Sequence, residues 1–253
     1  MVQVFKFKWM KRLLSLLFLL SVLGLAPVEA AVSHGLFSSL LKKHVTATGK
    51  VNYQGFIQDS TQLNRYLKLL SDNAPAPSWS RNDQLAYWIN AYNAFTIQLI
   101  IRNYPLKSIK DIGSRIQIPF VNSPWDIKFI RLGKELYDLN NIEHDILRSK
   151  FNEPRIHFAI VCASVSCPKL LNEAYEGARI NAQLEAQAIA FINDPSRNKL
   201  ASNQAQLSAI FSWFKGDFTK QGNLISFINK YSKVKVNQNA KISSLNYNWN
   251  LNS

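Results

Sequence analysis

The distribution of apolar and polar positions predicts a chain rich in helices. The strongest helical signal runs from Ser80 to Tyr104, and its body, Leu85 to Ile101, is apolar nearly all round. A helix without a polar face is buried in a protein core. Ser80 can cap the first turn, and Pro105 ends the helix. The sequence therefore predicts a buried central helix at about Ser80–Tyr104.

Shorter segments surround this helix. Apolar spacings of three and four residues predict further helices over Leu36–His44, Thr61–Leu70, Asn140–Lys150, Glu173–Asn193, Phe211–Phe218 and Leu224–Tyr231. Turn residues and β-branched runs predict a short strand at Val51–Tyr53, a hairpin pairing Asp126–Ile130 with Glu135–Leu139, a buried strand at Arg155–Ala163, a hairpin within Leu200–Ile210 and an extended tail at Lys241–Leu251. The predicted fold class is α+β: a helix-rich single domain with a small, mostly antiparallel sheet.

The first thirty residues have the pattern of a secretory signal. Four basic residues precede the apolar run Leu13–Leu25, and Val28-Glu29-Ala30 resembles a cleavage site. A bilayer-spanning helix needs about twenty residues, so an uncleaved anchor is the weaker interpretation. We expect residues 1–30 to be removed, leaving a single domain over 31–253 without a transmembrane anchor. The expected location is periplasmic or secreted.

Composition supports a globular protein and leaves its partner open. Hydrophobic residues make up 47% of the chain and charged residues 18%, which excludes a disordered chain. The formal net charge of +14 suggests an anionic partner. Lysines and arginines are scattered, however, and no nucleic-acid motif is present. We therefore expect no nucleic acid as a partner, and an anionic envelope surface as a possible one.

The segment Arg155–Pro168 contains both cysteines of the chain, Cys162 and Cys167, together with His157. One interpretation is a Cys162–Cys167 disulfide that joins the strand to the following turn, as exported proteins often have. A second is a thiol nucleophile with His157 as its base. Residues five apart on a regular strand point to opposite faces, so Cys162 would face away from His157, whereas Cys167 lies beyond the strand end. A third is a metal site, but the spacing fits no established zinc motif. We predict no metal and no cofactor.

Two asparagines, Asn90 and Asn93, lie one turn apart on the otherwise apolar central helix. A buried amide without a partner costs about 1–3 kcal/mol, so each must be hydrogen-bonded. Either they hold neighbouring loops through backbone hydrogen bonds, or they line a polar pocket beside the cysteines. In the second case Asn90 or Asn93 would orient a substrate or stabilise an oxyanion, with Asn93 as a candidate binding residue.

A third polar group lies on the helix predicted at Asn140–Lys150. Asn140 is predicted to cap this helix, with Glu143 supporting the cap. His144 can contact Arg148 one turn later. Glu143, His144 and Arg148 are candidate binding residues. The two remaining histidines of the mature chain, His34 and His44, are expected to face solvent.

These three polar groups together resemble the family called domain of unknown function 547, or DUF547. The stretches that carry the resemblance are Tyr87–Ala94, Asn141–Arg148, Arg155–Pro168, Phe191–Asp194, Ser212–Phe218 and Tyr247–Asn252. The resemblance covers about Lys42 to Asn252 and implies an exported bacterial protein, without implying an activity. Asn248 stands where the family often has Asp.

The central helix followed by a His-bearing strand is also distantly similar to transglutaminase and papain-like cores. In those cores a cysteine begins the helix. Here the helix offers Asn90 and no cysteine, so the thiols near His157 would have to replace the usual nucleophile.

Two functions follow from these candidates. The first is an exported thiol-dependent hydrolase or acyl transferase that acts on a small-molecule or peptide ligand. Cys167 or Cys162 would be its nucleophile and His157 its base. The second is a non-catalytic periplasmic binding or scaffolding protein with a Cys162–Cys167 disulfide. The two differ in whether the protein contains a free, reactive thiol.

Overall fold

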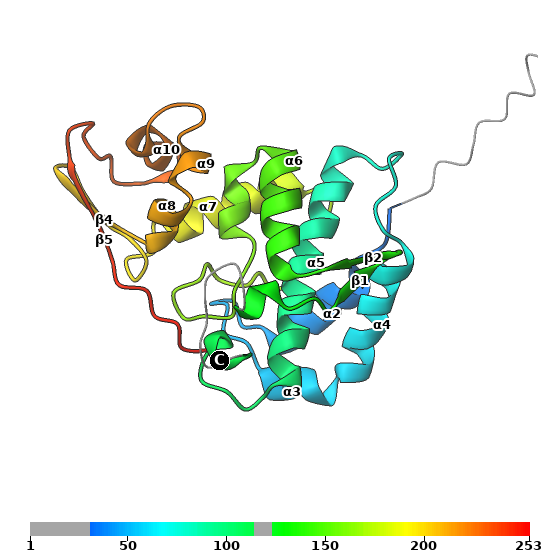
Figure 1. The fold of residues 1–253 in the computed structure, drawn as a ribbon. Coiled ribbons are helices and arrows are strands. Elements are labelled where there is room, and N and C mark those ends of the chain that lie inside the picture. Colours follow the sequence, from blue (N-terminus) through cyan, green and yellow to red (C-terminus); the bar gives the residue numbers. More distant parts are fainter. Residues whose placement is uncertain (1–30, 114–122) are drawn as a thin grey trace, which may run out of the picture. The chain divides into compact units, whose positions relative to one another are not determined.

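A computed structural model describes residues 31–113 and 123–253. The described residues belong to one compact unit. The predicted signal segment, residues 1–30, lies outside the described residues. Helices and short strands alternate along the chain (Figure 1), which confirms the helix-rich α+β class.

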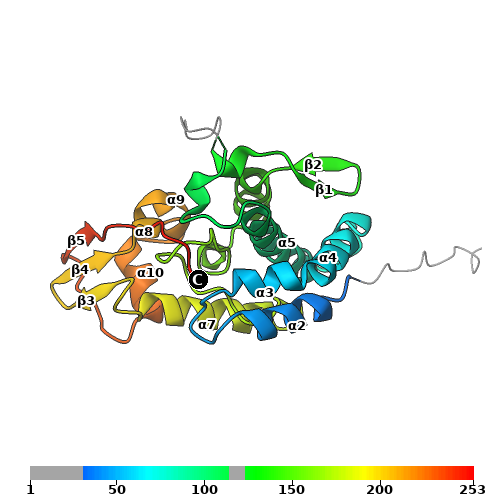
Figure 2. The same cartoon turned by 90° about the horizontal axis from the view of Figure 1, so that it is seen from below.

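The first part of the chain is a helical layer built around α5 (Arg81–Arg102). This helix is buried along Leu85–Ile100, apart from the half-buried Trp88, as its apolar sequence predicts. Ser80 caps it by accepting a hydrogen bond from the backbone N–H of Asp83. The helices α3 (Tyr53–Gln58) and α4 (Ser60–Asp72) pack against α5, and α2 (Gly35–His44) packs against both of them (Figure 2).

The C-terminal part has its own apolar cluster, in which Phe158 packs against Phe191 and Phe218. The helices that supply this cluster are α7 (Ile180–Ile192), α8 (Ala209–Trp213), α9 (Lys215–Phe218) and α10 (Leu224–Tyr231). Phe158 belongs to this cluster, whereas the adjacent Ala159 belongs to the cluster around α5. The segment that contains Phe158 and Ala159 therefore runs between two hydrophobic cores.

The strands form two small sheets. Strands β1 (Ile130–Leu132) and β2 (Glu135–Tyr137) form a hairpin around Gly133, with Leu132 opposite Glu135. The second strand is as predicted, but the first shares only Ile130 with the predicted Asp126–Ile130, because Asp126 belongs to a 3₁₀ turn. Strands β3 (Lys199–Ala201) and β4 (Gln204–Leu207) form the second predicted hairpin. The predicted tail contributes β5 (Lys241–Ser244), which pairs with β4 in parallel.

Three predicted elements differ in the structure. The strand expected at Val51–Tyr53 is a single bridge between Val45 and Val51, after which α3 begins. The strand expected at Arg155–Ala163 is instead the 3₁₀ helix η4 (Pro154–Phe158) followed by irregular chain. Pro154 begins this turn, and the Glu153 side chain caps it by accepting from the Arg155 N–H. Burial against two cores accounts for the apolar sequence without a strand.

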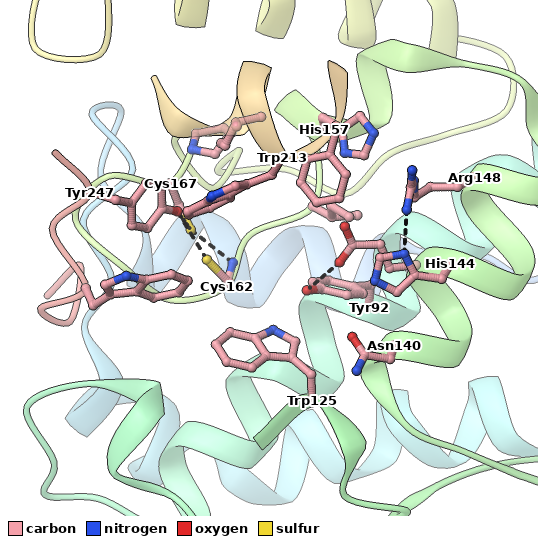
Figure 3. A pocket seen from close by; sticks show the side chains of 16 residues that line it. Tyr92, Trp125, Asn140, His144, Arg148, His157, Cys162, Cys167, Trp213 and Tyr247 are labelled. Carbon is pink, nitrogen blue, oxygen red and sulfur yellow. Dashed lines mark hydrogen bonds between the residues drawn. The ribbon is translucent and has the colours of Figure 1, made fainter. Parts of the chain in front are cut away.

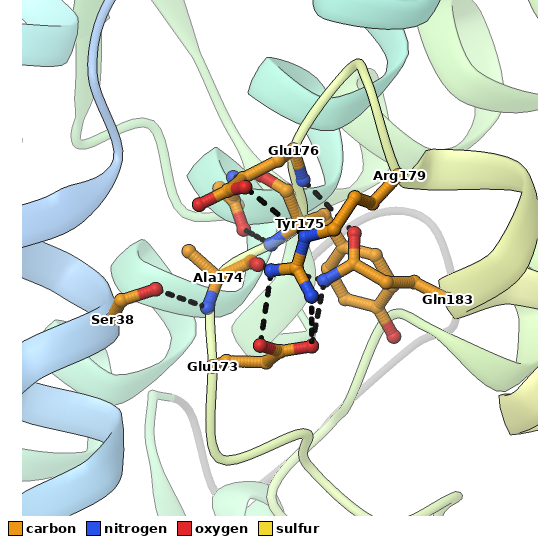
Figure 4. A network of polar contacts seen from close by, with 8 residues as sticks. Ser38, Glu173, Ala174, Tyr175, Glu176, Arg179 and Gln183 are labelled. Carbon is orange, nitrogen blue, oxygen red and sulfur yellow. Dashed lines mark hydrogen bonds and ion pairs between the residues drawn. The ribbon is translucent and has the colours of Figure 1, made fainter.

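The helix predicted from Glu173 begins only at Ile180. The residues before it form a loop that Arg179 holds together through ion pairs with Glu173 and Glu176 (Figure 4). Gln183 donates to the carbonyl of Ala174 in the same loop. These side-chain hydrogen bonds and ion pairs take the place of the backbone hydrogen bonds of a first helical turn. The loop lies against α5, because Asn90 of that helix binds the backbone of Tyr175.

The helix predicted at Asn140–Lys150 is the π-helical segment η3 (Asn141–Arg148), continued by α6 (Ser149–Phe151). The predicted cap is wrong. Asp138 caps η3 by accepting from the Asn141 N–H at 2.6 Å, while Asn140 donates to Asp126. Glu143 is buried and does not cap. Two further 3₁₀ turns are η1 (Ile109–Asp111) and η2 (Pro124–Asp126).

The last residues return to the cysteine segment. The Val165 N–H donates to the carbonyl of Asn250 at 2.7 Å, and the Asn252 N–H donates to the carbonyl of Ala163 at 3.1 Å. The chain after β5 therefore completes the wall beside the two cysteines.

Candidate functional site

A cavity of about 450 Å³ opens between the two hydrophobic clusters (Figure 3). Six of the eight predicted site residues line it: Glu143, His144, Arg148, His157, Cys162 and Cys167. Most of its other walls are aromatic, namely Tyr92, Trp125, Trp213, Phe214, Tyr247 and Trp249. The sulfur atoms lie at one end in Figure 3, and His144 and Arg148 lie at the other.

The sulfur of Cys167 is surrounded by hydrogen-bond donors. The backbone N–H of Cys162 donates to it at 3.1 Å and the hydroxyl of Tyr247 at 3.3 Å. The hydroxyl of Ser164 lies 3.2 Å from the sulfur and donates to the Tyr247 hydroxyl at 3.1 Å. Cys167 is only 2% exposed, so these groups replace water around the sulfur. Donors that converge on a sulfur favour its thiolate form.

The two thiols differ in acidity. Burial opposes ionisation of Cys167, but hydrogen bonds from Cys162, Ser164 and Tyr247 outweigh it and lower the pKa of the Cys167 thiol. The hydrogen bond of Cys162 to Cys167, together with burial, raises the pKa of Cys162. Burial also raises the pKa of Tyr247, so its phenol keeps a proton to donate. Cys167 is therefore the thiolate of the pair. Both cysteines are free thiols in the structure.

The turn between the cysteines contains an unusual backbone conformation. Ala163 has a φ of 59°, in the left-handed region that non-glycine residues rarely adopt. The Cys167 N–H then donates to the carbonyl of Ser164 at 3.1 Å and closes a turn. This turn brings Cys167 back to Cys162. Backbone strain of this kind often accompanies functional sites.

Glu143 is a buried carboxyl group in the same cavity. The hydroxyl of Tyr92 donates to it at 3.3 Å. Burial raises the pKa of Glu143 to about 7, against the opposing effects of Arg148 and of the Tyr92 hydrogen bond. A carboxyl with this pKa is present in both protonation states near neutral pH, which suits it to proton transfer.

An ionic network lies beside Glu143. Asp217 accepts from the Arg148 Nε at 2.6 Å and is paired with the His157 Nε2 at 2.9 Å. The hydrogen bonds from His157 and Arg148 hold the pKa of Asp217 well below its usual range. Arg148 also contacts the Nδ1 of His144 at 2.7 Å, as the one-turn spacing predicts.

His157 occupies the inner side of this network. Its ring stacks on Phe214 with centroids 4.0 Å apart, and burial lowers its pKa. With Nε2 paired to Asp217, its buried Nδ1 has no hydrogen-bond partner within the described residues. No hydrogen bond joins His157 to either sulfur in that part of the chain. The structure thus places His157 in the predicted cavity without forming the predicted Cys–His pair.

The two asparagines of α5 have other contacts. Asn90 is fully buried and binds the backbone of Tyr175 twice, accepting from its N–H at 2.9 Å and donating to its carbonyl at 2.8 Å. Asn93 likewise donates to the carbonyl of Ala159 and accepts from the N–H of Val161, both at 2.9 Å. Neither lines the cavity. They fix the loops on either side of it, as the structural interpretation of the sequence suggests.

The expectation of solvent-facing histidines near residue 31 is wrong. His34 is buried and contacts the hydroxyl of Tyr66 at 2.7 Å, while His44 is buried and paired with Asp59 at 2.6 Å. Burial lowers the pKa of His34 to about 4. Both histidines stabilise the layer of helices before α5.

Several side chains of the site are not identified from the sequence. Ser164 and Tyr247 bind the sulfurs, Tyr92 binds Glu143, and Asp217 joins His157 to Arg148. A partial signal existed for all four, since each lies within a segment that resembles DUF547. For two of them, Asp217 and Tyr247, the contacts are distant in the sequence. Their contacts to His157 and to the cysteines span 60 to 85 positions, which local patterns do not reveal.

No group of His, Cys, Asp and Glu within residues 31–113 and 123–253 is arranged to hold a metal ion. No helix in those residues is long and apolar enough to cross a bilayer.

Comparison with known proteins adds one result. Residues 76–192 match the model of a family described as "Protein of unknown function, DUF547". This match supports the DUF547 family. The matched residues contain α5, η3 and both cysteines, but Asp217 and Tyr247 lie beyond them. Neither the curated proteins nor the solved structures contain a match.

Proposed function

We propose that this protein is an exported thiol-dependent hydrolase or acyl transferase with Cys167 as its nucleophile. The observation that carries this proposal is the convergence of the Cys162 N–H and the Tyr247 hydroxyl on the Cys167 sulfur, in a cavity that also contains Glu143. A thiolate stabilised by fixed donors needs no adjacent imidazole to deprotonate it. The proposal therefore does not require a Cys–His hydrogen bond.

The reaction has two steps. The Cys167 thiolate attacks the carbonyl carbon of an ester or amide, a C–S bond forms, and the bond to the leaving group breaks. The leaving oxygen or nitrogen takes the proton of the Glu143 carboxyl. Water, or an acceptor hydroxyl or amine, then attacks the thioester and gives a proton to the Glu143 carboxylate. The acyl product and the thiolate are released, and both side chains return to their starting forms.

Glu143 is a better proton carrier than His157 for this cycle. Its pKa of about 7 matches neutral conditions. The His157 side chain is 1% exposed, covered by Phe214 and paired with Asp217. We assign His157 a positioning role. It is paired with Asp217, which in turn holds Arg148, and the charge of Arg148 lowers the pKa of Glu143.

The walls of the cavity favour an apolar acyl group. Trp125, Trp213 and Phe214 supply aromatic faces, and Trp213 is 49% exposed. Apolar cavities with a few polar groups bind ligands mainly through the apolar body. The substrate class is therefore an ester, thioester or amide with a hydrophobic acyl chain. The positive charge is suited to a location near an anionic envelope surface.

The test uses p-nitrophenyl esters with acyl chains of increasing length. Wild-type protein should release p-nitrophenol and show an acyl adduct on the Cys167 peptide by mass spectrometry. Cys167→Ser should lose at least a hundredfold in kcat/KM, while Cys162→Ser should retain most of it. Glu143→Gln should remove the pH dependence centred near 7. Full activity in Cys167→Ser, or adducts on other residues only, would overturn the proposal.

The deep burial of Cys167 favours a second candidate, a non-catalytic binding protein, because a thiol that is 2% exposed is poorly placed for attack. In that case the aromatic cavity binds a ligand without reacting. Quenching of tryptophan fluorescence by an apolar acid, equal in wild type and Cys167→Ser and without any ester turnover, would favour this candidate.

A further inference from the structure

The thiol of Cys162 takes no step in the proposed reaction, although its sulfur belongs to the same cluster as that of Cys167. The Ser164 hydroxyl lies 3.5 Å from the Cys162 sulfur and 3.2 Å from the Cys167 sulfur. The Tyr247 hydroxyl lies 3.4 Å and 3.3 Å from the same two atoms. Two hydroxyl groups are thus shared between two sulfurs.

The backbone holds the two cysteines in this arrangement. The left-handed residue Ala163 reverses the chain, and the Cys167 N–H donates to Ser164 to close the turn. The Cys162 N–H points at the Cys167 sulfur at 3.1 Å. Disulfide formation requires the two residues to be near each other before the sulfurs approach. The 3.1 Å contact between the Cys162 backbone and the Cys167 sulfur shows that the two residues are neighbours in the folded chain.

Exposure differs between the two residues. Cys162 is half-buried, whereas Cys167 is buried, and both sulfurs belong to the cavity wall. A small reagent that enters the cavity can reach both sulfurs, of which that of Cys167 accepts hydrogen bonds from the Cys162 N–H and the Tyr247 hydroxyl. The neighbouring Cys162 is then placed to attack whatever becomes attached to it.

We propose that Cys162 and Cys167 form a reversible dithiol–disulfide couple that exchanges with small disulfides, with Cys167 as the attacking thiol and Cys162 as the resolving thiol. In the first step the Cys167 thiolate attacks one sulfur of the small disulfide, forms a mixed disulfide and releases one thiol. In the second step Cys162 loses its proton to solvent and attacks the Cys167 sulfur. The second thiol leaves, and the protein disulfide remains. The small disulfide is reduced, and the two cysteines are oxidised.

The couple also controls the proposed acyl transfer, and this part of the inference rests on the proposed function. A Cys167 sulfur that is bonded to Cys162 has no thiolate to attack a carbonyl. Oxidation would therefore stop ester hydrolysis, and a reducing agent would restore it. Such a device suits a compartment whose redox state changes.

The experiment exposes the full chain to oxidised glutathione and follows thiols by mass spectrometry. Wild type should form the Cys162–Cys167 disulfide, with the mixed disulfide seen only transiently, and dithiothreitol should reverse it. Cys162→Ser should accumulate a stable glutathione adduct on Cys167. Cys167→Ser should react at least tenfold more slowly. Val165→Ala, on the exposed part of the same turn, is the matched control and should behave as wild type.

Several outcomes separate the possible failures. Either of two results overturns the dithiol couple, even if ester hydrolysis proceeds. In one, the wild-type protein stops at a glutathione adduct; in the other, Cys162→Ser forms no adduct. A reversible protein disulfide without ester hydrolysis leaves the couple intact and removes the proposed acyl transfer. Circular dichroism of each variant ensures that the comparison is made between folded proteins.

Discussion

Burial of Glu143 makes a prediction about stability that does not depend on any substrate. Its pKa is raised from 4.5 to about 7, chiefly by burial, so the folded protein holds a proton there that the unfolded chain has lost. Between these two values the folded state binds more protons than the unfolded state, and stability must fall as the pH rises. Glu143→Gln removes this term, because an amide stays neutral.

The magnitude follows from the size of the shift. One pKa unit corresponds to about 1.4 kcal/mol, so a change from 4.5 to about 7 corresponds to about 3 kcal/mol. The penalty is absent below about pH 4.5 and fully present above about pH 7. The advantage of Glu143→Gln over wild type should therefore grow by about 3 kcal/mol between pH 4.5 and pH 8. Any constant effect of the new amide cancels in this difference.

Urea denaturation at pH 4.5, 6 and 8 measures the effect. Wild type, Glu143→Gln and the exposed control Glu135→Gln are compared, and the free energy of unfolding is plotted against pH. The Glu143→Gln curve should diverge from wild type as the pH rises, while Glu135→Gln should follow wild type. Parallel curves for wild type and Glu143→Gln would refute the raised pKa and, with it, the choice of Glu143 as proton carrier.

Three other substitutions test the scaffold, each by chemical denaturation. Asn90→Leu should destabilise the fold by about 2–4 kcal/mol because both backbone groups of Tyr175 lose their partner; a variant as stable as wild type would contradict this. His34→Phe should reduce the loss of stability between pH 6.5 and pH 4. In this range the unfolded chain binds a proton at His34 that the folded protein, with a His34 pKa of about 4, does not bind. A free energy of unfolding that falls between pH 6.5 and pH 4 as steeply as in wild type would count against this. Gly177→Ala should cost about 2 kcal/mol, because its new Cβ would lie 1.9 Å from the carboxylate of Asp83 and 2.9 Å from the backbone nitrogen of Asp83. A variant as stable as wild type would show that the loop can move away from Asp83 at no cost.

Regular elements were predictable where the chain has one dominant periodicity. The all-apolar body of α5 predicts a buried helix, and the turn around Gly133 predicts the hairpin of β1 and β2. The apolar run after Pro154 is misleading, because it contacts two hydrophobic clusters without being a strand. Apolar character reports burial, and only a clear period reports the backbone conformation.

The site was predictable in its residue types and only partly in its contacts. The sequence singles out both cysteines, His157 and Glu143, and the structure brings them to one cavity. It does not reveal that Asp217 pairs with His157, because these residues are 60 positions apart. It predicts that the Asn90 amide is hydrogen-bonded but not that its partner is the backbone of Tyr175, 85 positions away. Tertiary hydrogen bonds of this kind leave no local trace.

The path of the last residues across the cysteine turn has a consequence for biogenesis. A nascent chain synthesised only as far as α10 contains both thiols but lacks the phenol of Tyr247, which donates to the Cys167 sulfur. Its backbone also lacks the partners that Asn250 and Asn252 provide for the turn. The reactivity of the Cys167 thiol should therefore appear only after the C-terminal residues have been synthesised and have folded onto the cysteine turn. Its measurement can report when folding is complete.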